Sequence, residues 1–444
     1  MPGRVPVTLA EPAARPSGGK DGRDDENQEE IPLGRNRQFL LMWAGSGAAV
    51  LAERFSAAPF TFVVIYEGYA KGLAGLVAFA ALLPQLLVQL PAGVLVDRWD
   101  RRRVMIVADL VRLAGIGSVA LALVLGHVWL WHLAVVAFVQ GTFTVFYTLS
   151  ERGAVRFVVP RKQLPSALAR NEARARAAAL GGHPAGGALY ELTRWAPFAC
   201  SAALYLFSLI SILLLRGPMP PPPHPAGKTR RSPWAEVREG LAWVWRERDL
   251  RIALVLVAVS NMIFQGIILA LQFIAKDTGR SPVSVSLILA AGGVGGLLGA
   301  LAGGRWIQRA GMERIMVVTY LVWALVLPGM ALTRDAWLLG GLFALMSGIG
   351  ASVTVAGTVH QMRVTPDRLQ GRVGSVVFLM VSGFSAFGAL GAGYLLQEAG
   401  TRTAMLVFSA VMAGLAAVAA LVFGPRAGRR RSRGRHLAGG RHSR

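Results

Sequence analysis

Glu53 is an acidic residue in the middle of an apolar segment that covers residues 39–63. A charged side chain at the centre of a bilayer costs roughly 2.5–3.5 kcal/mol on insertion scales, so it is expected to face protein or a water-filled cavity. One interpretation is a protonatable group that binds a proton and a cationic or polar substrate in turn. The alternative is a structural ion pair with a basic residue on another helix. Arg54 points about 100° away around the same helix, so it is not the natural partner.

Three further ionisable residues lie in apolar segments. Asp109 and Arg112 are three residues apart in segment 104–125 and therefore share a helix face. They form either an intrahelical ion pair that lowers the cost of insertion or part of a gate. His183 lies in segment 172–192 among four glycines, where it could titrate near neutral pH and couple to protons. Packing or hydrogen bonding is the alternative role for a single histidine in such a segment.

Amide side chains are the remaining buried polar candidates, and some share a helix face because they are four residues apart. Interhelical hydrogen bonds explain most of them. One or two are expected to line a substrate cavity, and Gln265 beside Gly266 is the preferred one. The candidates are Gln85, Gln89, Gln140, Asn261 and Gln265.

Apolar segments of membrane-spanning length must position these residues. The chain has 444 residues, of which 54% are hydrophobic and only 16% charged, which is too apolar for a soluble protein. We predict an all-α polytopic membrane protein with twelve spans in two six-helix bundles. The predicted spans are 39–63, 73–96, 104–125, 128–149, 172–192, 196–215, 251–274, 283–304, 315–333, 336–357, 372–396 and 402–424.

The segments outside the spans are polar. Residues 1–35 have no apolar run, which excludes a cleaved signal peptide and predicts a disordered tail. Residues 216–250 join the bundles 36–215 and 251–424, and they include an amphipathic helix that lies on the membrane surface or covers the second bundle. The basic tail 425–444 is interpreted as an anchor near anionic lipid.

The net charge of +23 comes mainly from arginines in short loops and tails on one side of the predicted bundle. The positive-inside rule explains this distribution and, with an even number of spans, predicts that both termini are cytoplasmic. Nucleic acid is therefore not an expected partner. Nearly all the positive charge is Arg rather than Lys, which suggests a GC-rich bacterial genome and hence a bacterial inner membrane.

One short basic loop separates the second and third spans. It contains Gly93, Asp97, Arg98, Arg101 and Arg102, and residues 93–107 are echoed by residues 304–318 of the second half. Repeats of six spans are common in secondary transporters, with substrate bound at the repeat interface.

This loop resembles the signature G-x-x-x-D-[RK]-x-G-[RK]-[RK] of the major facilitator superfamily, except that Asp100 replaces the second glycine. Residues 104–112, 159–189 and 365–395 resemble the drug:proton antiporters that include macrolide-efflux and siderophore-export proteins. The resemblance implies alternating access and export coupled to protons. It also implies a gate formed by Asp97, the loop arginines and Arg112, in which Asp97 meets the start of the eleventh span near residues 372–374.

Other kinds of site lack their motifs. There is no G-x-x-x-x-G-K-[ST], H-E-x-x-H or G-x-S-x-G pattern, and the single Cys200 excludes an intramolecular disulfide and a cysteine-based metal site. We expect no cofactor, no metal and no enzymatic activity. The sequence predicts a monomeric proton-coupled exporter of a small hydrophobic or amphipathic compound. A proton-coupled uptake symporter and a non-transporting sensor or accessory protein are the alternatives.

Overall fold

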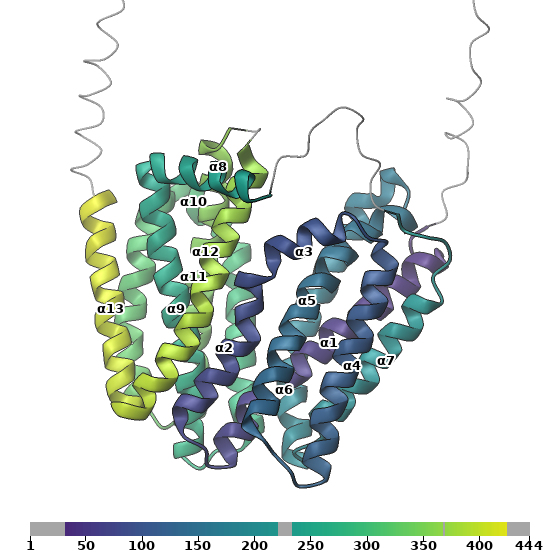
Figure 1. The fold of residues 1–444 in the computed structure, drawn as a ribbon. Coiled ribbons are helices and arrows are strands. Elements are labelled where there is room, and N and C mark those ends of the chain that lie inside the picture. The colour runs from purple at the N-terminus through teal and green to yellow at the C-terminus, as the bar shows by residue number, and fades with distance from the viewer. Residues whose placement is uncertain (1–31, 221–232, 367–368, 424–444) are drawn as a thin grey trace, which may run out of the picture.

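The computed structural model describes residues 32–220, 233–366 and 369–423, and every regular element in these ranges is a helix. Two helical bundles lie side by side (Figure 1). The start of α1 and the end of α13 lie at the same end of the molecule as α8 (Figure 1). An even number of crossings produces this arrangement.

The first bundle contains α1 to α7, and the second contains α9 to α13. The helices of the first bundle are α1 (Arg37–Tyr66), α2 (Lys71–Leu87), α3 (Gln89–Val96), α4 (Arg101–Val124), α5 (Leu130–Val158), α6 (Leu164–Leu192) and α7 (Ala196–Leu213), with the short 3-10 helix η2 (Arg161–Gln163) before α6. The others are α8 (Pro233–Arg246), α9 (Arg248–Asp277), α10 (Pro282–Leu332), α11 (Ala336–Val364), α12 (Gln370–Glu398) and α13 (Gly400–Phe423).

Each of the twelve predicted spans lies on a helix, which confirms the fold class. Ten spans within the described residues are apolar and long enough to cross a membrane, and α2 with α3 forms an eleventh. The two predicted spans 283–304 and 315–333 both lie on α10. The remaining predicted span lies on α6, which is not apolar enough to count among these eleven because its first half carries Arg170, Glu172, Arg174 and Arg176.

Some span boundaries were wrong. Segment 73–96 is not one straight helix, because the chain bends by 50° between α2 and α3. Pro91 has no N–H to donate to the carbonyl of Leu87, so the helical hydrogen bonding is interrupted there. α5 continues nine residues past the predicted end at 149, to Val158, and α6 begins at Leu164 rather than 172. Charged residues predicted in a loop therefore lie on helices.

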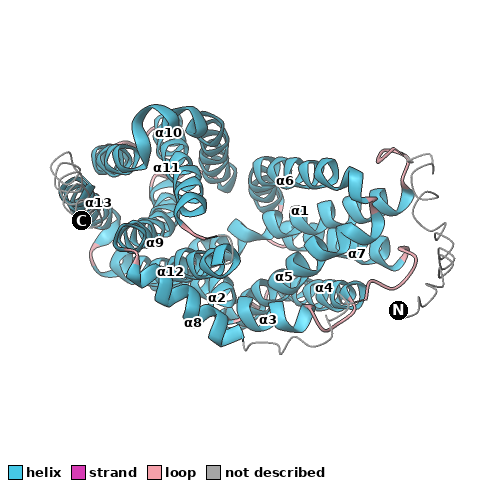
Figure 2. Ribbon diagram, turned by 90° about the horizontal axis from the view of Figure 1, so that it is seen from above, coloured by secondary structure: helices cyan, strands magenta, loops and turns pink. Residues whose placement is uncertain are grey.

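The bundles meet along two helix pairs, α2 with α12 and α6 with α10. Figure 2 shows α2 beside α12 at this border. Small residues permit the close approach: a Cβ at Gly75 would lie 2.7 Å from the carbonyl oxygen of Ala389 and 2.8 Å from Cα of Gly393. Close backbone contact through glycine is a common way for membrane helices to associate.

Polar contacts join the bundles at the end opposite to α8. Lys71 forms an ion pair with Asp277 at 3.4 Å and donates to Thr401 at 3.2 Å. The N–H of Gly72 donates to Gln397 at 3.1 Å, and the hydroxyl of Tyr66 donates to the carbonyl of Arg280 at 3.1 Å. These four hydrogen bonds and ion pairs close one end of the interface.

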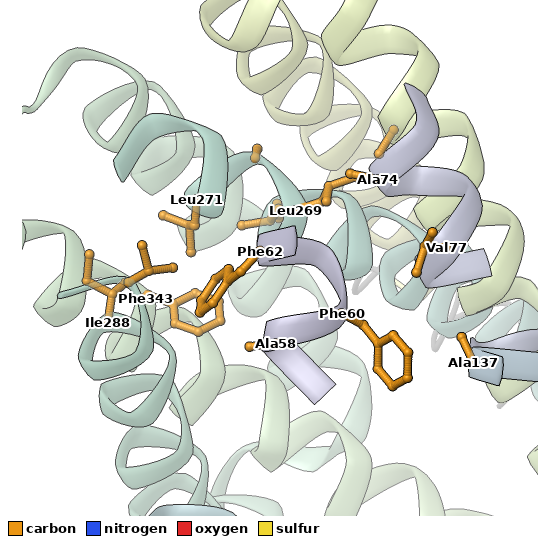
Figure 3. Close-up of a cluster of buried hydrophobic side chains, with 14 of the residues drawn as sticks. Ala58, Phe60, Phe62, Ala74, Val77, Ala137, Leu269, Leu271, Ile288 and Phe343 are labelled. Carbon is orange, nitrogen blue, oxygen red and sulfur yellow. The ribbon is translucent and has the colours of Figure 1, made fainter. Parts of the chain in front are cut away.

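Aromatic residues of α1 fill the adjacent core. Phe60 and Phe62 point in opposite directions from α1 (Figure 3). Phe60 points toward Ala137 (Figure 3), whereas the ring of Phe62 packs against Tyr66 and Tyr190 at centroid distances of 6.0 and 5.6 Å. Leu271 and Phe343 of the second bundle belong to the same buried cluster, so the hydrophobic core is continuous between the bundles.

The amphipathic helix α8 packs on the second bundle. Val244 is fully buried and contacts a cluster that includes Leu250 and Val373. Glu239 of α8 forms an ion pair with Arg372 at 2.6 Å. Leu241 and Trp245, which flank Val244 at about 60° and 100° around the helix, remain exposed. This geometry favours the interpretation that α8 covers the bundle.

Parts of three predicted segments lie outside the described residues. These are residues 1–31 of the predicted disordered tail, residues 221–232 of the linker between the bundles, and residues 424–444, which include the basic tail. In the echo of the basic loop, Gly304, Gln308 and Arg309 lie on α10, but their side chains are not described.

Candidate functional site

A cavity of about 560 Å³ lies between the two bundles. Helices α1, α2, α5 and α6 provide most of its first wall, and α9, α10 and α12 provide the second. The hydrogen bond of 2.5 Å from Thr61 to Gln272 links the bundles on the wall of this cavity. Its polar lining residues include Glu53, Arg54, Gln85, Gln89, Gln140, Arg152, His183, Gln265 and Gln272.

Glu53 lies on the cavity wall with its side chain half-buried. Among the described residues its carboxylate has neither an ion-pair partner nor a hydrogen-bond donor. Arg54 also lines the cavity, but it packs its side chain against Gly182 of α6 and forms no ion pair with Glu53. The structure thus presents a carboxylate to a cavity with no cation from the described part of the chain in contact with it.

His183 occupies the boundary between this cavity and a second one in the other bundle. Its Nδ1 atom is buried and has no hydrogen-bond partner in the described part of the chain. Gly182 and Gly186 beside it allow α6 to approach Arg54 and Phe55 of α1 closely. The glycines therefore position the histidine by bringing α6 against α1.

The five candidate amides divide between two cavities. Gln85, Gln89, Gln140 and Gln265 line the central cavity. Gln140 also donates to the carbonyl of Arg112 at 2.7 Å, so it forms an interhelical hydrogen bond between α5 and α4 as well. Asn261 lies instead in the second cavity, where its amide donates to the carbonyl of Val257 at 2.9 Å.

Asp109 and Arg112 form a buried ion pair inside the first bundle. Ser208 donates to the second oxygen of Asp109 at 2.7 Å. The guanidinium of Arg112 lies between the rings of Tyr147 and Tyr205, with its central carbon 4.2 and 4.6 Å from the two ring centroids. Neither member of the pair lines the central cavity, although Tyr205 does. The structure therefore places Asp109 apart from Glu53.

A second buried ion pair, which the sequence did not predict, joins α5 and α6. Glu151 of α5 accepts from Arg174 of α6 at 2.6 Å, with side chains only 11% and 8% exposed. Arg174 also donates to the carbonyl of Trp43 at 2.9 Å, which connects α1 to the pair. The available signal was an acidic residue just beyond one predicted span and an arginine inside the next. Arg152, predicted in a loop, was missed as a lining residue of the central cavity.

The basic loop forms its own network of hydrogen bonds at the end of the first bundle. Asp100 caps α4 by accepting from the N–H of Arg103 at 3.0 Å, and it also accepts from the N–H of Met219 at 2.7 Å. Arg102 donates to the carbonyls of Ile212 and Leu213 at the end of α7. A carboxylate cap explains how an aspartate replaces the glycine of the resembled signature.

The carboxylate of Asp97 is 54% exposed and lies 3.7 Å from the guanidinium of Arg101, which is buried. Arg101 also donates to the carbonyl of Pro220 at 3.2 Å. Gly93 and Arg98 lie on either side of Asp97 in the chain. The helix whose start was predicted to meet Asp97 is α12, which begins at Gln370 in the other bundle. The ion pair between Asp97 and Arg101 thus lies within the first bundle.

Comparison with known families now identifies the chain. Residues 31–430 match the family described as transmembrane secretion effector, within the major facilitator transporters. The chain belongs to this family. It is a multi-pass membrane transporter and not an enzyme.

Efflux proteins are among its similar relatives. The multidrug efflux pump Tap of Mycolicibacterium fortuitum is 29% identical over 416 residues, which cover 87% of this chain and 94% of Tap. Macrolide efflux protein A of Streptococcus pyogenes is 29% identical over 129 residues, which cover 29% of this chain and 31% of that protein. The resemblance to the macrolide-efflux branch is therefore confirmed.

Two solved structures share the fold at low sequence identity. A point mutant of the nucleoside transporter NupG has a TM-score of 0.72 at 11% identity, and the match covers 87% of this chain and all of NupG. A bacterial homologue of the human lysosomal transporter Spinster, solved inward-facing and unoccupied, has a TM-score of 0.68 at 14% identity. That match covers 87% of this chain and 98% of the homologue.

Proposed function

We propose that this transporter exports a small hydrophobic or amphipathic compound from a bacterial cell in exchange for protons. The names of Tap and macrolide efflux protein A support export of drug-like compounds. A cavity of about 560 Å³ has the size of a pocket for such a compound. The protein is proposed to act as a monomer in the cytoplasmic membrane.

The observation that carries proton coupling is the carboxylate of Glu53, which faces the central cavity and has no partner among the described residues. A carboxylate paired with a protein cation would have a structural role. An unpaired one can bind either a proton or a basic group of the substrate, and these two ligands compete for the same charge. Competition of this kind is sufficient to couple the entry of protons to the export of substrate.

The proposed cycle follows from this competition. In the outward-facing state, a proton from outside neutralises Glu53, which weakens its attraction for the substrate and favours release. The bundles then rock to the inward-facing state, and the proton leaves to the cytoplasm. The restored carboxylate binds the next substrate molecule. His183 lies on the same cavity wall and is the second proposed proton site, whereas Asp109 would take part through the buried cluster.

This conformation is interpreted as inward-facing. The basic loop and α8 lie at one end, which the positive-inside rule assigns to the cytoplasm together with both termini. The contacts of Lys71, Gly72 and Tyr66 close the opposite end. A substrate would therefore enter the central cavity from the cytoplasmic end.

The basic loop is proposed to act as a gate that changes partners between states. Asp97 lies close to Arg101 in this state, and its carboxylate is half exposed. When the cytoplasmic ends of the bundles approach, Asp97 would accept hydrogen bonds from the N–H groups at the start of α12. Arg102 would keep α4 attached to α7 in both states through the carbonyls of Ile212 and Leu213.

The decisive experiment replaces Glu53 with Gln, which preserves shape and removes the charge. Efflux of lipophilic cationic dyes from pump-deficient cells is measured with and without a protonophore. We expect wild-type efflux that the protonophore abolishes, and loss of efflux in Glu53→Gln at equal membrane content. Glu172→Gln is the matched control, because Glu172 is exposed and pairs with Arg176 on the surface of α6. Full efflux by Glu53→Gln would disprove the proposal.

A further inference from the structure

A second cavity of about 390 Å³ lies within the second bundle, beside the central one. Helices α9, α10 and α11 form most of it, and α6 contributes His183. His183, Ile268 and Leu289 line both cavities. A molecule in the central cavity therefore has a neighbouring compartment that begins at the shared wall.

Three aromatic rings form one side of this compartment. The ring of Phe264 lies 5.5 Å from Trp323 at an angle of 30° and 5.7 Å from Phe343 at 15°. The indole N–H of Trp323 donates to the carbonyl of Met346 at 3.0 Å, which fixes the plane of that ring. Such near-parallel faces suit another flat ring, since aromatic groups stack in offset arrangements at these separations.

Glycines of α10 form a further part of the wall. A Cβ at Gly296 would meet no atom closer than the carbonyl oxygen of Ser347, at 3.9 Å. At Gly292 the added atom would instead collide with the ring of Phe343. Gly292 therefore makes room for the aromatic ring, whereas Gly296 borders open space within the cavity.

The chemistry of the lining differs from that of the central cavity. The described lining residues include no Asp, Glu, Lys or Arg, and apart from His183 and the indole of Trp323 the polar side chains carry hydroxyls and one amide. Asn261 uses its amide N–H to bond Val257, which leaves its side-chain oxygen as an acceptor. The central cavity, in contrast, contains Glu53, Arg54 and Arg152. The two compartments thus differ in charge.

We propose that the cavity lined by Phe264, Trp323, Phe343 and Gly296 is a subsite for the flat, uncharged aromatic part of the exported compound. The basic part of the same molecule remains in the central cavity near Glu53. This inference rests on the proposed export function and specifies its substrate class: amphipathic compounds with a planar aromatic system on one side and a basic group on the other.

Single cysteines can report occupancy of each compartment separately. In a Cys200→Ser background, which removes the one native thiol, Gly296→Cys marks the aromatic subsite and Ala57→Cys marks the central cavity. The purified transporter in lipid nanodiscs is labelled with N-ethylmaleimide in the presence of ethidium, a planar aromatic cation, or tetrapropylammonium, a cation without rings.

We expect ethidium to slow labelling at both positions and tetrapropylammonium to slow it only at Ala57→Cys. With ethidium at about ten times its Kd, labelling should fall roughly tenfold, because only about one tenth of the sites is then unoccupied. Protection by ethidium at Ala57→Cys alone would overturn the subsite. Equal protection of Gly296→Cys by both compounds would also overturn it, because the aromatic wall would then bind the charge.

A plug variant provides an independent test. Gly296→Val should weaken ethidium binding and leave tetrapropylammonium binding unchanged, since the new side chain fills the subsite without a backbone collision. Gly414→Val on the exposed face of α13 is the control, because a Cβ there meets no atom within 4 Å. Unchanged ethidium binding in Gly296→Val would disprove the inference. If neither compound protected either cysteine, the proposed substrate class itself would fail, and the subsite with it.

Discussion

Lys71 of α2 and Asp277 of α9 form an ion pair of 3.4 Å that connects the two bundles at the end opposite to α8. The ammonium group also lies 5.1 Å from the ring centroid of Phe273 and donates to Thr401 of α13. One side chain of the first bundle therefore contacts two helices of the second. Any movement that separates the bundles at this end must break all three contacts.

Asp277→Asn should shift the transporter modestly toward the state that is open at this end. Because the two side chains are 30% and 51% exposed, the pair contributes only about 0.2–1 kcal/mol. The shift can be measured as a longer distance between spin labels at Leu192→Cys and Trp337→Cys in the Cys200→Ser background, since both positions are exposed near this end. The charge-swapped pair, Lys71→Asp with Asp277→Lys, should restore the shorter distance. An unchanged distance in Asp277→Asn would exclude a role in closure.

Removal of one member of the Asp109–Arg112 pair should destabilise the first bundle strongly. Asp109→Leu leaves the guanidinium of Arg112 buried without its carboxylate, which costs about 3–5 kcal/mol. The thermal unfolding temperature in detergent should drop sharply. Glu172→Gln is the control, because that pair is exposed and should give almost no change. The double variant Asp109→Leu, Arg112→Met should recover much of the loss, and its failure to do so would contradict this account.

The sequence predicted the helices well because twelve apolar segments of membrane length leave little freedom of assignment. It predicted boundaries less well where helices extend beyond the hydrophobic segment. Glu151 and Arg174 illustrate the reason: Glu151 lies just beyond one predicted span and Arg174 near the start of the next, yet the two compensate each other and both helices continue. Pairing across helices is a tertiary property that hydropathy along the chain does not contain.

The candidate site was likewise predicted from the sequence only in part. Glu53 and four of the five candidate amides lie on the central cavity, because a polar side chain deep in an apolar helix must face inward. The same argument could not distinguish Asp109, which is surrounded by its own bundle, from Glu53, which faces the space between bundles. Helix rotation and bundle packing decide that difference. Asn261 and Gln265 are four residues apart and still line different cavities.

Gly75→Val should prevent the bundles from closing at the α2–α12 contact. The added side chain would meet the backbone of Ala389 and Gly393, which cannot move without shifting α12. Overpacking typically costs about 1–3 kcal/mol, so the closed state should lose roughly five- to 150-fold in population. Efflux should fall, and the Leu192–Trp337 label distance should lengthen. Gly117→Val is the control, because a Cβ there has no neighbour within 4 Å. Normal efflux by Gly75→Val would contradict the proposed role of this contact.

The packing of α8 can be tested by placing a charge at a buried and at an exposed position of the helix. Val244→Asp would bury an unpaired carboxylate against Leu250 and Val373, so α8 should detach and tryptic cleavage after Arg246 should accelerate. Leu241→Asp, at an exposed position, should leave cleavage unchanged if α8 covers the second bundle. If α8 instead lay on the membrane with its exposed apolar face in lipid, Leu241→Asp would release it and Val244→Asp would not. The two variants therefore distinguish the interpretations that the amphipathic pattern alone left open, because one places the charge at the buried contact with the second bundle and the other at an exposed position of the same helix.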